Sequence, residues 1–202
     1  MTKIAKLVSY LFHPAFMPLL GIFIIFNSGI YASSLPWEAE RYTYLIIALF
    51  SVLLPFSILP VFYYWRLIAS IELKERKQRI LPLSVSTLCL ILMHLFISRI
   101  IPIKLITSYT FAIAALAIFL LFLNMFFKVS MHLLGVGGIT GLIAALTVLY
   151  QIRPFFMLVS IILISGLLAS ARIQLKAHTQ FEVIAGYVVG FLTMYLFLIS
   201  MV

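Results

Sequence analysis

The chain has 202 residues, of which 65% are hydrophobic and only 9% charged, and its formal net charge is +9. A soluble domain is roughly half apolar and a quarter charged, so this composition excludes an ordinary soluble protein and indicates an integral membrane protein. Nucleic acid is a poor partner for the positive charge, because no soluble basic domain exists to hold it. Anionic lipid headgroups, in contrast, would attract it.

Apolar runs follow one another along the whole chain. A membrane-spanning helix needs about 20 mostly apolar residues, and hydropathy predicts such spans at 15–30, 43–65, 83–99, 105–126, 133–150, 154–170 and 183–201. We therefore expect an all-α fold, a polytopic transmembrane helix bundle of about seven spans that forms one domain over 1–202. A six-span core would also fit this pattern.

The start of the chain also has features of a signal peptide. Lys3 and Lys6 precede an apolar stretch that is followed by small residues at 32–34, as in a cleavable leader. Because Pro14 and Pro18 interrupt that stretch, we favour a first span that stays in the protein.

Small residues mark two of the predicted spans. Gly137 and Gly141, and again Gly186 and Gly190, stand one helical turn apart, which lets neighbouring helices approach closely. We expect these glycines to pack helices. The single Cys89 lies in an apolar run, which excludes an intramolecular disulfide and a cysteine zinc cluster.

Seven spans place alternate loops on opposite sides of the membrane. The N-terminus and the loops 66–82, 126–132 and 170–182 then share one side, which we call the N-terminal face. Ten of the 14 Lys and Arg residues belong to this face, so the positive-inside rule predicts that it is cytoplasmic. Basic residues that bind an anion would weaken this inference.

Three polar segments that are far apart in sequence can converge on the N-terminal face. They contribute basic residues at 74–79, then Ser130 and His132, then Arg172, His178 and Glu182. Arginine forks match phosphate oxygens and lysine adds a point charge, which predicts a phosphate site.

Two histidines in such a site suggest a division of labour. A histidine can attack phosphorus when a carboxylate holds its other ring nitrogen, and His178 and Glu182, four apart on a helix, share a face. His132 could protonate the departing alkoxide and later accept a proton from water, while Ser130 donates to a phosphoryl oxygen. The scheme needs no metal and no cofactor.

These residues resemble the type 2 phosphatidic acid phosphatase superfamily, also called lipid phosphate phosphatases. The third motif of that family reads Ser-Arg, five residues, His, three residues, Asp; Ser170, Arg172, His178 and Glu182 match it with one inserted residue and Glu in place of Asp. The second motif is Pro-Ser-Gly-His, of which the segment 129–132 keeps the Ser and the His.

The first motif of the family, Lys, six residues, Arg-Pro, is matched only loosely. Lys74 and Arg79 are the best candidates, and Pro82 lies three residues beyond Arg79. The resemblance implies a phosphatase-like core at about 66–202, in a multi-pass protein of the bacterial inner membrane. Its substrate would be a phosphate or diphosphate ester of a lipid, with membrane lipids as its other partners.

The resemblance also implies a role for each site residue. His178 would be the nucleophile that forms a phosphohistidine, Glu182 would orient it, and His132 would be the general acid. The substrate phosphate would be bound by Arg172, Ser130, Arg79 and Lys74.

Other interpretations remain open at this stage. A catalytically inactive relative could bind lipid or scaffold a partner, and a transporter would also be apolar, although paired charges near the midplane would then be expected. His13, before Pro14, and His94, within a span, are interpreted as local packing or interfacial residues.

Overall fold

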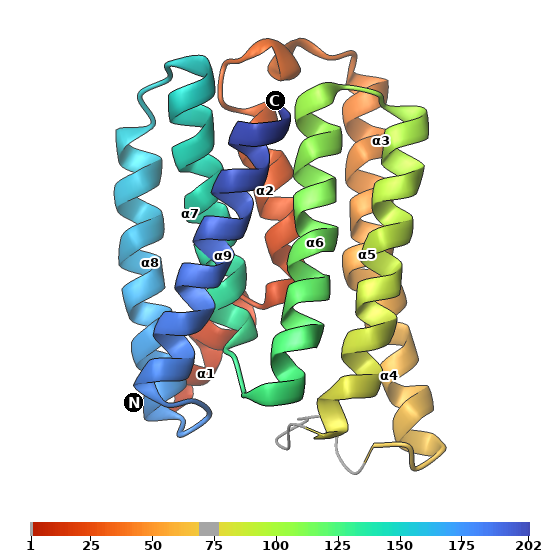
Figure 1. Ribbon diagram of the computed structural model, residues 1–202, viewed down its shortest axis with the longest axis vertical. Helices are drawn as coiled ribbons and strands as arrows, with labels where there is room; N and C mark the ends of the chain where they lie inside the picture. The colour runs from red at the N-terminus through yellow and green to blue at the C-terminus, as the bar shows by residue number, and fades with distance from the viewer. Residues whose placement is uncertain (1, 69–76) are drawn as a thin grey trace.

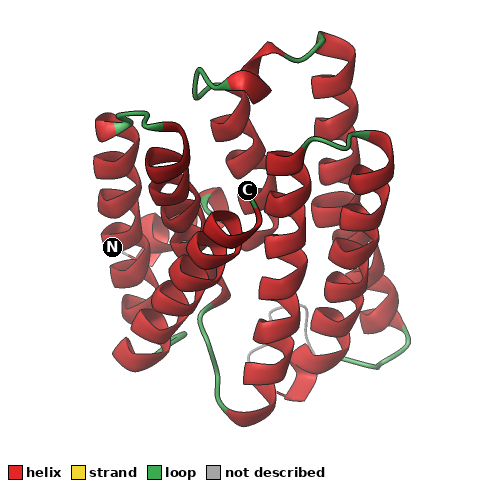
Figure 2. Cartoon of the chain, turned by 45° about the horizontal axis from the view of Figure 1, so that its top comes forward, coloured by secondary structure: helices red, strands yellow, loops and turns green. Residues whose placement is uncertain are grey.

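The computed structural model describes residues 2–68 and 77–202, and all regular secondary structure in these ranges is helical (Figure 2). Among these residues, seven helical stretches are long and apolar enough to cross a membrane: Thr2–Phe26, Trp37–Tyr64, Ile80–Ile100, Lys104–Phe126, Met131–Tyr150, Phe155–Gln174 and Gln180–Met201. The prediction of an all-α bundle with seven spans is therefore confirmed, and the fold is that of a multi-pass membrane protein.

The first span starts much earlier than its predicted bounds of 15–30. It consists of α1 (Thr2–Leu11), a short 3-10 turn η1 (Pro14–Phe16) and α2 (Met17–Phe26). Because α1 is amphipathic and far less apolar than α2, a hydropathy window misses it. The break falls at Pro14, since proline cannot continue the hydrogen-bond ladder of a helix.

The second span contains a local widening. It runs from α3 (Trp37–Ala48) through a π-helical turn η3 (Leu49–Leu53) into α4 (Leu54–Tyr64). Pro55 has no N–H to offer the Ser51 carbonyl, and a π-turn accommodates such a missing bond. The remaining elements are the turns η2 (Tyr31–Ser34) and η4 (Lys77–Arg79) and the helices α5 (Ile80–Ile100), α6 (Lys104–Phe126), α7 (Met131–Tyr150), α8 (Phe155–Gln174) and α9 (Gln180–Met201).

The spans alternate in direction as predicted. Figure 1 shows the N-terminus at one end of the bundle, together with the loops that join α6 to α7 and α8 to α9. The C-terminus lies at the opposite end, with the loops that join α5 to α6 and α7 to α8. The first of these ends is the N-terminal face.

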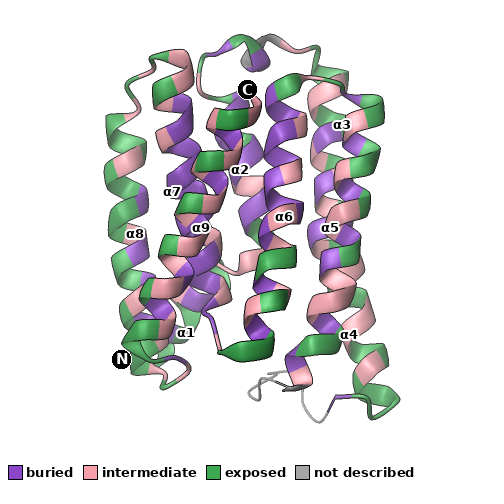
Figure 3. Ribbon diagram, viewed as in Figure 1, coloured by how far each residue is buried: buried purple, intermediate pink, exposed green. Residues whose placement is uncertain are grey.

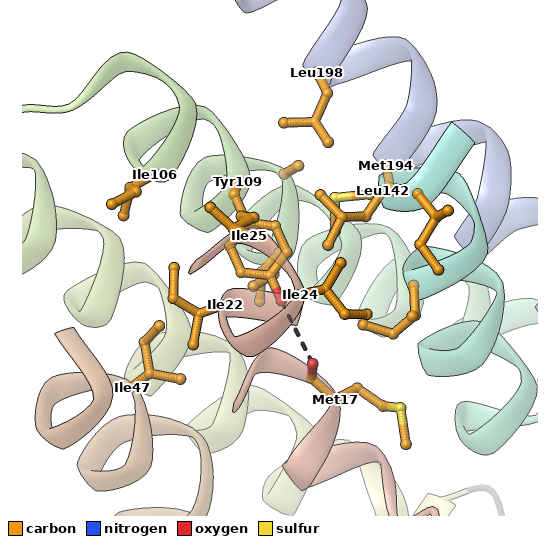
Figure 4. Packing of buried hydrophobic residues seen from close by; sticks show 14 of the residues in the cluster. Met17, Ile22, Ile24, Ile25, Ile47, Ile106, Tyr109, Leu142, Met194 and Leu198 are labelled. Atoms are coloured by element: carbon orange, nitrogen blue, oxygen red, sulfur yellow. Dashed lines mark hydrogen bonds between the residues drawn. The ribbon is translucent and has the colours of Figure 1, made fainter. Parts of the chain in front are cut away.

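Helix α7 is the centre of the bundle. Two thirds of its most apolar window (67%) is buried, against 22% for α8, which is exposed along much of its length (Figure 3). Phe156 and Leu163 are among the exposed side chains of α8. Deeper in the core, the hydroxyl of the buried Tyr109 of α6 donates to the backbone carbonyl of Pro18 at 3.0 Å and lies 3.4 Å from that of Met17, the contact drawn in Figure 4. The exposed apolar side chains of α8 are suited to contact lipid, whereas the hydroxyl of Tyr109 holds α2 against α6 in the core.

The four glycines predicted to pack helices all lie between α7 and α9. A Cβ on Gly186 would stand 2.7 Å from the Ser130 carbonyl oxygen, and one on Gly137 or Gly190 would collide with a backbone carbonyl of the facing helix. The two backbones therefore touch, as small residues allow. This contact, which we call the glycine seam, brings the starts of α7 and α9 together at the N-terminal face.

Candidate functional site

The glycine seam ends in a direct backbone hydrogen bond. The Ser130 N–H donates to the Glu182 carbonyl oxygen at 3.2 Å. Ser130 is the residue before α7, and Glu182 lies in the first turn of α9. The positive ends of two long helix dipoles therefore meet here, which favours an anion between them.

His178 and Glu182 form the pair that the sequence predicted. Nδ1 of His178 lies 2.7 Å from Oε2 of Glu182. An ionised carboxylate can only accept a hydrogen bond, so Nδ1 carries the proton and Nε2 of the neutral ring keeps its lone pair. The pair therefore has the arrangement that a nucleophilic histidine requires.

The pair does not, however, sit on one helix as expected. His178 precedes α9, and the cap residue Thr179 stands between it and the helix. The Thr179 hydroxyl accepts from the Glu182 N–H, while the Glu182 carboxylate accepts from the Thr179 N–H, both at 3.3 Å. This capping box turns the carboxylate back toward the preceding loop. The longer Glu, in place of the Asp of the family motif, therefore holds both the cap and His178.

The surroundings of His178 favour its neutral form. Its pKa is lowered to about 4, mainly by burial and also by the charges of Lys128, Arg79 and Arg172, against the opposing effect of the hydrogen bond to Glu182. At neutral pH the ring is therefore unprotonated at Nε2.

Two buried polar groups beside this pair have no hydrogen-bond partner within the described part of the chain. They are the hydroxyl of Ser130, which is fully buried, and Nε of Arg172, in the last turn of α8. An unsatisfied buried donor costs about 1–3 kcal/mol, more if charged. Both groups are donors that match phosphoryl oxygens.

His132 lies in the first turn of α7 and is 9% exposed. Its Nε2 lies 3.1 Å from the backbone carbonyl oxygen of Ser9, in α1. Its ring also meets the ring of His13 edge to face, with centroids 5.6 Å apart. Nδ1 of His13 accepts from the Ala15 N–H and so caps η1. His13 thus has a local structural role, as interpreted from the sequence, and in addition a contact with the site.

The basic residues of the first motif are only partly described. Arg79 is 6% exposed, and burial and the charge of Arg172 lower its pKa while Glu182 raises it, so its guanidinium lies within the same charge cluster. Lys74 lies outside the described residues. Ser170 is exposed and donates back to the Gly166 carbonyl within α8.

Lys128 is a site residue that sequence reasoning did not select. Its Nζ donates to the Ala177 carbonyl oxygen at 2.7 Å, and burial, Arg79 and Arg172 lower its pKa while Glu182 raises it. An open depression of about 360 Å³ lies at this place, lined among others by Lys128, Lys176 and His178. The only feature of the sequence that could have indicated Lys128 as a site residue is its position two residues before Ser130.

Ser9 is the second site residue that was not predicted from the sequence. Its hydroxyl accepts a hydrogen bond from Nη1 of Arg172 at 3.2 Å, in addition to the contact of its carbonyl with His132. It belongs to no motif, because it lies in the amphipathic segment before the first predicted span.

Within the described ranges, no three His, Cys, Asp or Glu side chains come together in a group that could hold a metal ion. No protein-family model matches the chain, and neither a curated protein sequence nor a solved structure is similar to it. The case for a function therefore depends on the geometry of the site.

Proposed function

We propose that the protein is a membrane-embedded phosphatase that hydrolyses a phosphate or diphosphate ester of a lipid through a phosphohistidine intermediate, without a metal ion. The supporting observation is the 2.7 Å pair of His178 and Glu182 beside the unpartnered donors of Ser130 and Arg172. The proposed nucleophile, its orienting carboxylate and the proposed phosphate ligands thus come from the start of α7, the end of α8 and the start of α9 together with the loop before it.

The first half of the reaction transfers the phosphoryl group to the protein. Nε2 of His178 attacks phosphorus, a P–N bond forms, and the ester P–O bond breaks. The departing lipid alkoxide takes a proton from protonated His132. Arg172, Arg79 and Ser130 offset the charge that spreads over the phosphoryl oxygens.

The second half restores the resting protein. Water attacks the phosphohistidine, the P–N bond breaks, and His132 takes the proton that the water loses. Inorganic phosphate leaves, and both histidines are ready for another cycle. Glu182 stabilises the positive charge on His178 while the P–N bond exists.

The location of the site at one end of the spans favours a lipid substrate. The headgroup of a lipid at the N-terminal face would meet the charged cluster, while its tails would lie beside the exposed apolar side chains of α8 and α9, such as Leu163, Leu167 and Ile184. The proposed location is the bacterial inner membrane.

A second candidate is an inactive relative that binds a lipid phosphate or scaffolds a partner. One observation favours it: Arg172 and His132 are already hydrogen-bonded to Ser9. Such a protein would bind the headgroup without releasing phosphate.

Phosphate release by the purified protein in lipid nanodiscs, with a chelator present, tests the proposal. The substrates would be phosphatidic acid, phosphatidylglycerol phosphate and a polyprenyl diphosphate. Wild-type protein should release phosphate from at least one of them, and His178→Ala should not. The control is His94→Ala, a histidine of α5 whose Nδ1 lies 3.1 Å from the Thr110 hydroxyl, remote from the site. Binding of a lipid phosphate without release would instead support the inactive alternative.

A further inference from the structure

Ser9 contacts two groups of the proposed site at once. Its carbonyl oxygen lies 3.1 Å from Nε2 of His132, and its hydroxyl oxygen lies 3.2 Å from Nη1 of Arg172. Ser9 is 7% exposed, and nothing in the resemblance assigns it a role.

The contact with His132 fixes which ring nitrogen can move a proton. A backbone carbonyl only accepts, so Nε2 of His132 carries a proton, and Nδ1 is the nitrogen that gains and loses one. The arrangement parallels that of His178, whose Nδ1 is held by Glu182. Each histidine thus has one nitrogen held by an oxygen and one nitrogen without a hydrogen-bond partner among the described residues.

The contact with Arg172 leaves the useful edge of the guanidinium available. Nε and Nη2 form one edge of this group, and that edge matches two oxygens of a phosphate. Ser9 binds Nη1, which lies outside that edge, while Nε is buried without a partner in the described residues. The hydroxyl therefore orients the arginine without occupying its Nε edge.

Helix α1 is attached to the site through a narrow strip of small residues. Ala5 and Ser9, one turn apart, are buried, whereas Ile4, Leu7 and Leu11 are each more than 60% exposed. α1 packs mainly on α8, the helix that carries Arg172. A larger residue at position 5 would therefore push Ser9 away from its two partners.

We propose that Ser9 is a positioning residue of the phosphatase site, whose carbonyl orients His132 for proton transfer and whose hydroxyl orients Arg172 for phosphate. This inference rests on the proposed function. It makes α1, which lies outside the phosphatase-like core of 66–202, a part of the active site.

Two substitutions separate the roles of the hydroxyl and the carbonyl. Ser9→Ala removes only the hydroxyl, so KM and the inhibition constant of inorganic phosphate should both rise about 5- to 50-fold, equally for alkyl and aryl esters. Ser9→Thr keeps a hydroxyl and should recover most of this loss. Ala5→Leu displaces the carbonyl as well, so kcat should fall more for an alkyl phosphate than for an activated aryl phosphate, which needs little protonation.

The controls are Leu7→Ala, on the exposed side of α1, and Ser98→Ala, a half-buried serine of α5 that bonds within its own helix. An active wild type with an unchanged Ser9→Ala variant would overturn the inference about Ser9 alone. A faster Ser9→Ala variant would also overturn it, because Ser9 would then obstruct the site. If the wild type releases phosphate from no substrate, the proposed function fails and this inference with it.

Discussion

The glycine seam and the attachment of α1 hold the two sides of the site in different ways. Along the seam, backbone meets backbone, and the contact ends in the Ser130–Glu182 hydrogen bond. The contact of α1 with the site instead consists of two small side chains, Ala5 and Ser9, and of two hydrogen bonds that oxygen atoms of Ser9 accept. The proposed nucleophile is therefore held by the core of the bundle, whereas the proposed proton donor and one proposed phosphate ligand also depend on a peripheral helix.

The largest effect should come from the side of the site held by the seam. His178→Ala removes the proposed nucleophile, so phosphate release should fall by a factor of about 10,000 or more. Labelling with substrate carrying ³²P, followed by denaturation at alkaline pH, should detect phosphohistidine in the wild type and not in the variant. Residual activity near the wild-type level would exclude the phosphohistidine mechanism.

Glu182→Gln should have the next largest effect, because the side chain keeps its shape but loses its charge. We expect activity to fall about 10- to 10,000-fold while lipid binding remains. Since glutamine also completes a capping box, the thermal unfolding temperature should hardly change. If Glu182→Gln lost stability together with activity, the main role of the carboxylate would be to cap α9 rather than to orient His178.

If His132 is the proposed general acid, His132→Ala should show a dependence on the leaving group. An alkyl phosphate needs protonation as it departs and an activated aryl phosphate does not. We therefore expect a loss on the order of 100-fold or more for the alkyl ester and a much smaller one for the aryl ester. Equal losses on both substrates would contradict the role of general acid.

Adding one methyl group at a glycine of the seam tests how closely α7 packs on α9. In Gly190→Ala the new Cβ would collide with the Leu134 carbonyl, so the helices must separate, at a cost of about 1–3 kcal/mol in the free energy of unfolding. Gly166→Ala on α8, where a Cβ would meet nothing within 4 Å, is the matched control. Thermal unfolding in detergent would compare them; similar unfolding temperatures would argue against close packing of α7 on α9.

The smallest predicted effect concerns pH. The pKa of His178 in the folded protein, about 4, lies below its ordinary value of 6.5. Between these values the unfolded chain binds a proton at His178 that the folded protein does not, so the contribution of His178 to stability should fall as pH decreases from about 6.5 to about 4 and be constant above 6.5. His178→Ala should weaken this acid-dependent decrease in unfolding temperature; an unchanged decrease would assign it to other groups.

The difference between local sequence patterns and long-range contacts explains what the sequence could predict. The spans, the shared face and the pairing of His178 with Glu182 follow from hydropathy, alternation and short spacing, all of which are local properties. Ser9 and Lys128 join the site through contacts with residues 163 and 49 positions away. No periodicity in the sequence predicts contacts between residues so far apart. The capping box was also missed, because His178 was expected on the helix rather than before it.

The distance in sequence between Ser9 and Arg172 also has a consequence for biosynthesis. Ser9 leaves the ribosome 163 residues before Arg172. The early helix must therefore wait in the membrane with its buried face uncovered until α8 is inserted. A nascent chain without α8 would hold no assembled charge cluster, so the proposed hydrolysis of membrane lipids could begin only after α8 is inserted.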